Sequence, residues 1–279
     1  MVKSMKYSIL TYNFGGYDNP RKPQEVSEKV EYVFVTDAKT SPAPFIKKSL
    51  DIKGTPLVKC QYVKHHPFEF VSSDWVIVMD SSIEIQHDLT PLVEYCQEKG
   101  IEAMFISSPY ATTWKTEIKP NPVWQKRNPN LKKEIDWLWK TFHDERLNIE
   151  GMFYILHKSE LVNNIFSSIC SHCDDLKKHG SDPRPCQVIY SGTVANEFAD
   201  EIKTGKISFM SSYQIRGSGT LMRIYQHGSN RKFSDLKCRD KVNIIGIDYE
   251  PVTFKWLDRV EQSKPKVQKH TSGFEEWDE

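Results

Sequence analysis

The sequence predicts an α/β fold in which a mostly parallel central sheet is flanked by helices. Two observations carry this prediction. Short apolar runs rich in β-branched and aromatic residues recur along the 279 residues, which is typical of strands covered on both faces. Segments with helical patterns separate these runs, and such alternation is typical of parallel sheets. The predicted strands span residues 7–12, 32–36, 75–79, 103–107 and 152–156.

Two helices have clear start or stop signals. Thr90 can cap the first amides, Pro91 suits the first helical position, and Gly100 provides the C-terminal stop. A second helix follows Ser159, where apolar residues at helical spacing form one stripe that we assign to core packing. The stripe consists of Leu161, Val162, Ile165, Phe166 and Ile169.

Residues 111–133 lie between these helices, are polar and contain prolines, and predict a long loop before a helix at about residues 134–144. Trp114 and Trp124 lie in this loop, where they could stack on a ligand ring or anchor the loop by hydrophobic contact. Residues 1–260 are expected to form one domain. Residues 261–279, rich in Lys, Glu, Ser and Pro, are expected to form a mobile polar tail.

The composition argues against two classes of partner. Lys and Arg number 38 and Asp and Glu number 37, so a net charge of +1 provides no field that attracts nucleic acid or an anionic membrane. The apolar run at residues 7–10 is too short for the core of a signal peptide, and no other stretch reaches membrane-spanning length. We therefore expect a soluble, cytoplasmic protein.

The six cysteines, at positions 60, 96, 170, 173, 186 and 238, lack the spacing of a disulfide framework and are expected to be reduced thiols. Cys170 and Cys173 could form half of a zinc site. A structural zinc ion takes four ligands, however, and no second pair of matching spacing follows. We therefore interpret both as thiols carried on a helix.

Polar residues follow the first two predicted strands. In open α/β sheets, ligands gather at the carboxyl ends of the strands, so these residues are candidates for a binding site. Asn13 opens a segment with Gly15 and Gly16, which would let the backbone approach a ligand closely or would simply form a tight turn. Asp37 ends the second run, where it could accept hydrogen bonds from a base or ribose or cap a turn.

Asp80, Ser81 and Ser82 directly follow the apolar run 75–79 and suggest a metal site. A divalent cation that bridges diphosphate oxygens needs such oxygen ligands on a rigid element, although Asp is also a common turn residue. His227 could supply a second ligand, with Lys232 or a neighbouring arginine neutralising phosphate charge. A basic surface turn would have the same sequence.

Several segments together resemble a known family. They are residues 11–18, 23–37, 66–80 and 150–156, the last with its following helix, and in this order they cover roughly two thirds of the chain. The sequence resembles the glycosyltransferase-like family named for plant turgor-regulation and seed-mucilage proteins. The chain is also similar to the small glycan-building enzymes of large algal viruses.

The resemblance implies a GT-A-like, single Rossmann-like domain, with Asp80 at the place of a DxD-type metal motif whose second acidic residue is absent here. The metal that we expect there is Mn²⁺ or Mg²⁺, with Asp80 and, from its own local pattern, His227 as the protein ligands. The resemblance further implies a nucleotide-sugar site. We assign to this site Thr11, Tyr12, Asn13, Gly15, Gly16, Tyr17, Asp37, His66, Asp80, Ser81, Ser82 and Lys232.

The catalytic carboxylate is less clearly marked. The family usually reads Arg-Asp-Gln where this chain has Arg184-Pro-Cys-Gln187, so the acidic residue is replaced and Asp182 is its nearest substitute. Glu150, at the opening of the strand beside the acceptor region, is the preferred candidate. In an inverting transfer either residue would deprotonate an acceptor hydroxyl, whereas a retaining transfer requires no external base in that role.

The leading functional hypothesis is transfer of a sugar, from a UDP-sugar with UDP-xylose as the first to try, to a hydroxyl of a glycan or glycoconjugate. One alternative is a nucleotidyltransferase, although the sequence lacks a P-loop motif. The other alternative is a catalytically silent protein that binds carbohydrate or nucleotide. The missing acidic residues favour that reading, and the joint presence of Asp80, His227 and Glu150 opposes it.

Overall fold

The structure, a computed structural model, describes residues 7–18, 21–107, 130–143, 147–178, 186–211, 222–224, 242–244 and 247–249. Within them, a seven-stranded sheet has the order β3-β2-β1-β4-β7-β6-β8. Its strands are β1 (Tyr7–Asn13), β2 (Val30–Thr36), β3 (Ile46–Lys48), β4 (Trp75–Asp80), β6 (Ala103–Ser107), β7 (Ile149–His157) and β8 (Ile207–Ser211).

The sheet is mostly parallel, as predicted. Strands β3, β2, β1 and β4 run parallel to one another, and β6 runs parallel to β8. Strand β7 is the exception, because it runs antiparallel to both β4 and β6. Its beginning therefore lies at the edge of the sheet where the parallel strands end. The α/β class with a helix-flanked sheet is confirmed, and the arrangement agrees with a GT-A-like, single Rossmann-like domain.

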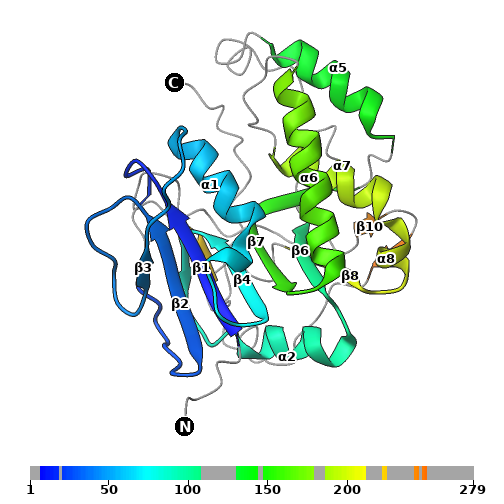
Figure 1. Cartoon of the computed structure of the whole chain (residues 1–279). Helices are drawn as coiled ribbons and strands as arrows, with labels where there is room; N and C mark the ends of the chain where they lie inside the picture. The colour runs from blue at the N-terminus through cyan, green and yellow to red at the C-terminus, as the bar shows by residue number, and fades with distance from the viewer. Residues whose placement is uncertain are drawn as a thin grey trace, which may run out of the picture.

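Helices cover both faces of the sheet. On one face, α1 (Pro56–His65), α6 (Glu160–Lys178) and α7 (Cys186–Glu197) bury apolar side chains against alternate residues of the strands (Figure 1). On the other face, α2 (Thr90–Lys99) packs with β5 (Ile83–Ile85), which pairs antiparallel with β9 (Met222–Ile224). Burial of two faces explains the continuous apolar runs of the central strands.

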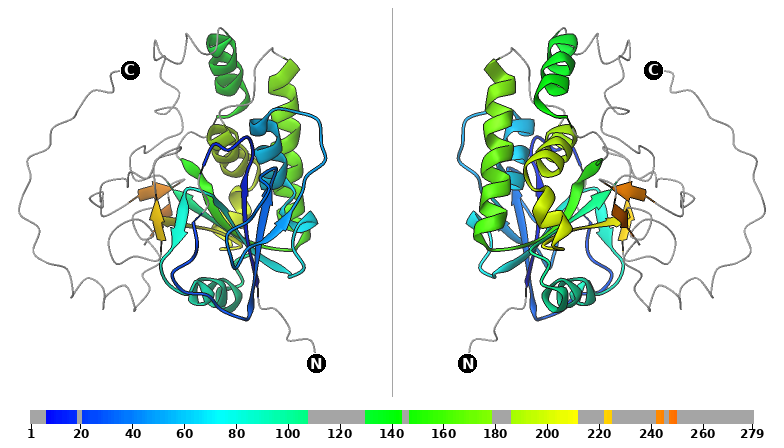
Figure 2. Two further views of the ribbon diagram at one scale, coloured as in Figure 1. Left: turned by 90° about the vertical axis from the view of Figure 1, so that its left-hand side faces the viewer. Right: turned by 90° about the vertical axis from the view of Figure 1, so that its right-hand side faces the viewer.

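The smaller elements complete the described chain. Helix α5 (Leu131–Thr141) lies against the ends of α6 and α7 in all views (Figures 1 and 2). The remaining elements are η1 (Pro67–Glu69), α8 (Ala199–Lys203), β10 (Val242–Ile244) and β11 (Ile247–Tyr249). None of the described helices combines the length and the apolar character that crossing a membrane requires.

The two helices with sequence signals form where they were predicted. Helix α2 ends at Gly100, which adopts the left-handed conformation with φ 66°. The predicted cap at Thr90 is wrong, because Thr90 lies inside the helix and the Asp88 carboxylate accepts its amide at 3.0 Å. In α6 the predicted stripe is buried, apart from the half-buried Leu161, and Ser159 accepts the Val162 amide at 3.3 Å.

Two predictions fall wholly or partly outside the described residues. Most of the predicted loop at residues 111–133 is not described, including Trp114 and Trp124, although residues 131–133 already belong to α5. The predicted domain boundary at residue 260 and the tail at 261–279 also lie outside.

The order of the strands creates a topological switch point between β1 and β4. From β1 the chain continues to β2 and β3 on one side, and then returns to place β4 on the other side of β1. In open α/β sheets, ligands bind in the crevice outside the carboxyl ends of the strands at such a point. The residues that end β1 and β4 are therefore the first to consider for a binding site.

Candidate active site

Asp80 lies at the switch point and is the centre of a polar cluster. It is the last residue of β4 and is aligned with Tyr12 of β1, whose hydroxyl donates a hydrogen bond to the Asp80 carboxylate. The ammonium of Lys64, from α1, lies 3.1 Å from the same carboxylate oxygen. The side chains of Lys64 and Asp80 are 15% and 18% exposed, so the pair is largely buried but still reached by solvent.

Lys64 joins three strands at this point. Besides Asp80, its ammonium donates a hydrogen bond of 2.7 Å to the carbonyl of Gly151 on β7 and lies 5.4 Å from the centre of the Tyr12 ring. The Lys64 carbonyl accepts a hydrogen bond of 3.0 Å from the hydroxyl of Tyr154. Burial, followed by the Asp80 charge, raises the pKa of Tyr12 well above its usual value, so its hydroxyl remains a donor.

Helix α1 brings Lys64 to the sheet. Thr55 caps the helix by accepting the Val58 amide at 3.4 Å, and Pro56 occupies the first turn, where a missing amide hydrogen has no cost. Sequence reasoning missed both this helix and Lys64. The Thr55-Pro56 pair was the available signal for the helix, because it has the same Thr-Pro sequence that predicted the start of α2.

The glycine pair forms a sharp turn after β1. Gly15 and Gly16 have φ of 70° and 66°, in the left-handed region that favours glycine. The Gly15 amide donates to both oxygens of the Asp37 carboxylate, at 3.1 and 3.0 Å. A Cβ on Gly15 would lie 2.9 Å from the Cγ of Pro56, so the turn is fitted against the start of α1. The structure therefore brings Asp37 and the glycines together.

A second set of contacts closes the loop that follows the glycines. The Asn13 side chain donates to the carbonyl of Asp18 and accepts the Asp18 amide at 3.4 Å. Ser81 donates to the Asp18 carboxylate at 3.4 Å, which links this loop to the residue after Asp80. Tyr17, at the tip of the loop, is 64% exposed, whereas Ser82 is buried.

Two other predicted binding residues lie apart from this cluster. Thr11 is buried within β1, and its hydroxyl has no hydrogen-bond partner in the structure described here. His66 lies just beyond the end of α1, where its ring contacts Tyr62 at 4.4 Å between centroids and it lines a cavity against α6. His66 follows the C-terminal end of α1, whereas the Gly15 turn lies against the N-terminal end, so the structure does not bring these two residues together. Asp182, His227 and Lys232 lie outside the described residues.

Glu150 begins β7 at the same edge of the sheet. It is buried, at 6% exposure, and is aligned with Ile106 near the end of β6. The next residue, Gly151, supplies the carbonyl that accepts the Lys64 ammonium. Glu150 and Asp80 thus come from neighbouring strands, and Lys64 bonds to Asp80 and to the residue after Glu150.

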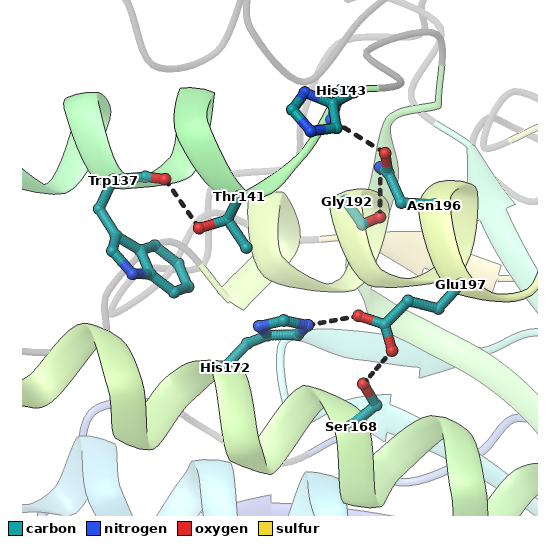
Figure 3. Close-up of polar contacts among 8 residues, drawn as sticks. All are labelled: Trp137, Thr141, His143, Ser168, His172, Gly192, Asn196 and Glu197. Atoms are coloured by element: carbon teal, nitrogen blue, oxygen red, sulfur yellow. Dashed lines mark hydrogen bonds and ion pairs between the residues drawn. The ribbon is translucent and has the colours of Figure 1, made fainter.

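Helix α7 fixes the segment that leads to Glu150. The Ile149 amide donates to the hydroxyl of Ser191 at 2.7 Å, and the His143 amide donates to Asn196 at 2.9 Å (Figure 3). Gly192 lies under the ring of Phe142, where a Cβ would come within 2.3 Å of a ring carbon. Phe142, His143 and Ile149 are therefore each held against α7.

Helix α6 supports α7 from the other side. Glu197 of α7 accepts hydrogen bonds from Ser168 and from His172, the latter at 2.5 Å (Figure 3). The His172 ring also contacts the rings of Trp137 and Phe142, at 6.0 and 5.0 Å between centroids. These contacts join α5, α6 and α7 into one support behind the start of β7.

The donor set around Asp80 does not fit a divalent metal within the described residues. No three His, Cys, Asp or Glu side chains in that part of the chain are grouped so that they could hold a metal ion. The residues after Asp80 are Ser81 and Ser82, which are weaker ligands than carboxylates, and Lys64 already pairs with Asp80. The predicted pairing of Asp80 with His227 stays a prediction.

Comparison with known proteins gives matches among solved structures but none by sequence. No family model matches the chain, and no curated protein matches its sequence. Among solved structures, the chain is similar to mouse xyloside xylosyltransferase 1 in its apo form, with a TM-score of 0.42 and 10% sequence identity. The match covers 75% of this chain and 86% of the mouse chain. The predicted membership of the turgor-regulation and seed-mucilage family therefore stays a prediction.

Proposed function

We propose that the protein is a glycosyltransferase that moves a sugar from a nucleotide donor, a UDP-sugar, to a hydroxyl of a glycan or glycoconjugate. One observation carries the proposal. At the switch point of the sheet, Asp80, Lys64 and the Gly15-Gly16 turn lie at the carboxyl ends of adjacent strands. The diphosphate of a nucleotide binds where the backbone can approach it closely and where a positive charge lies beside it. The glycine turn and the Lys64 ammonium provide these two features at the edge where ligands of such sheets bind.

The nucleotide would bind between the glycine turn and α1. The exposed ring of Tyr17 can stack on the base, and Asp37 can accept hydrogen bonds from the ribose in exchange for the Gly15 amide. The diphosphate would then lie towards Lys64, because this ammonium is held at the end of β4. The sugar would extend towards β7.

The chemistry is displacement at the anomeric carbon. The bond from that carbon to the diphosphate oxygen breaks, its electron pair stays on the diphosphate, and the acceptor oxygen forms the new bond. In an inverting transfer the proton of the acceptor hydroxyl passes to a carboxylate, and we assign this role to Glu150.

A panel of nucleotide sugars, starting with UDP-xylose, tests the proposal. We expect one of them to raise the melting temperature of the full chain, since a ligand selective for the folded state stabilises it, and to release its nucleoside diphosphate during incubation. Glu150→Gln should lower kcat by at least about a hundredfold while nucleotide binding is retained. If no nucleotide sugar stabilises the protein or turns over, the proposal is wrong.

A further inference from the structure

The Asp80 carboxylate is already paired with a cation, the ammonium of Lys64. Resting on the function proposed above, we propose that the ammonium of Lys64, rather than a divalent metal ion, supplies the positive charge that binds the diphosphate of the donor. The leaving diphosphate would then be stabilised by a side chain of this fold, with no metal in the bond-breaking step.

The contacts of Lys64 support this role. The ammonium is held by the Asp80 carboxylate at 3.1 Å and the Gly151 carbonyl at 2.7 Å, and it lies over the Tyr12 ring. Three elements thus fix the position of one charge before any ligand arrives. Preorganised charge of this kind stabilises a developing anion without reorganisation, and lysine is a common point charge for phosphate.

The same contacts oppose a metal ion at Asp80. A divalent cation bound to that carboxylate would lie beside the Lys64 ammonium and repel it. The ammonium would have to leave Asp80, Gly151 and the Tyr12 ring. In the described part of the chain, no grouped acidic, histidine or cysteine side chains would compensate by completing a metal site.

The charges of the ligand-free site also agree with a phosphate-binding role for Lys64. Asp80 is paired with one cation, so the pair contributes no net charge, and a diphosphate can approach it without meeting an isolated carboxylate. Both partners are about one sixth exposed, so a ligand can reach the ammonium without unfolding α1. Asp80 is then a positioning residue for Lys64.

Calorimetric titration of the full chain with UDP, in EDTA and then in excess Mn²⁺, tests the proposal. We expect UDP to bind in EDTA and Mn²⁺ to change its Kd by less than about threefold. Lys64→Met should raise Kd at least about tenfold in both buffers, because it removes a charge-assisted hydrogen bond. Lys64→Arg keeps the charge and should bind UDP more tightly than Lys64→Met.

Lys206→Met is the matched control. Lys206 pairs with the Glu102 carboxylate at 3.5 Å, beside the start of β8 and therefore at the opposite edge of the sheet, so its loss should leave Kd unchanged. Binding that requires Mn²⁺, or equal affinity of Lys64→Met and the parent, would overturn the lysine proposal alone. Absence of nucleotide binding in both buffers would overturn the glycosyltransferase proposal as well. The EDTA titration of the parent decides the question even if Lys64→Met does not fold.

Discussion

Gly192 shows how a single residue fixes the geometry of the candidate site. It lies in the middle of α7, where glycine is less favourable than alanine, yet a Cβ there would lie 2.3 Å from the ring of Phe142. The missing side chain lets Phe142 pack directly on the helix. The weaker helix propensity of glycine is thus offset by the close packing of Phe142 on α7.

Gly192→Ala should therefore destabilise the protein in spite of its better helix propensity. Displacing a packed ring costs about 1–3 kcal/mol, and a Cβ 2.3 Å from a ring carbon requires the upper part of that range, which exceeds the roughly 1 kcal/mol gained from alanine in a helix. Urea unfolding measures the difference in free energy. The double variant Gly192→Ala, Phe142→Leu should recover part of the loss, because the smaller side chain leaves room for the methyl group. A stabilised single variant would contradict this packing argument.

At the scale of elements, α7 positions the beginning of β7. Ser191 is fully buried and accepts the Ile149 amide while its own hydroxyl donates to the Gln187 carbonyl at 2.6 Å. Because the next residue is Glu150, this hydrogen bond fixes the backbone that carries the proposed base. Helix α7 thus links the helices on this face of the sheet to the strand that carries the proposed base, Glu150.

Ser191→Ala should remove that connection. The Ile149 amide would lose its partner in a buried place, which costs about 1–3 kcal/mol of stability. With Glu150 less firmly held, we expect kcat to fall while the Kd for the nucleotide stays within about twofold of the parent. Steady-state kinetics and UDP titration measure the two quantities. Ser41→Ala is the control and should leave kcat unchanged, because it removes a hydrogen bond of 2.9 Å to the Phe45 carbonyl beside β3, a strand that is not a neighbour of β7 in the sheet.

The elements differ in how far sequence could predict them. Strands β1, β2, β4, β6 and β7 were predicted because burial on two faces leaves an uninterrupted apolar run. Strand β3 has three residues at the edge of the sheet, too few to form a pattern. Helix α1 buries only Gln61, Val63 and His65, so its sequence has a weak apolar stripe and it was missed.

The candidate site was predicted in part for a related reason. Asp80, Asp37 and the glycine pair follow strands, and the ends of parallel strands meet at one edge whatever the details of packing. Lys64 has no such signal, because its pairing with Asp80 depends on where α1 crosses the sheet. Ser191 acts through a hydrogen bond between α7 and β7, which are neighbours only in the folded protein. Contacts of this kind follow from tertiary packing.

At the scale of the whole molecule, the layer that packs α1 against α6 contains a buried histidine. His65 is 8% exposed, contacts the rings of Phe166 and Tyr190, and has Nδ1 3.5 Å from the sulfur of Cys170. Burial, followed by the charges of His66 and Lys64, lowers its pKa from 6.5 to about 3. Between pH 6.5 and about 3, His65 is therefore neutral in the folded protein and protonated in the unfolded chain.

This buried imidazole should make the whole fold sensitive to acid. Since the unfolded state binds the extra proton between pH 6.5 and 3, stability falls as the pH falls through that range, by about 2 kcal/mol from this residue at pH 5. Urea unfolding at pH 7.5 and pH 5 measures the loss. In His65→Leu the loss should shrink by that amount. The exposed His143 is the matched control, and His143→Leu should lose as much stability on acidification as the parent. If His65→Leu keeps the full acid sensitivity, other groups cause it and the packing of α1 against α6 does not depend on a neutral His65.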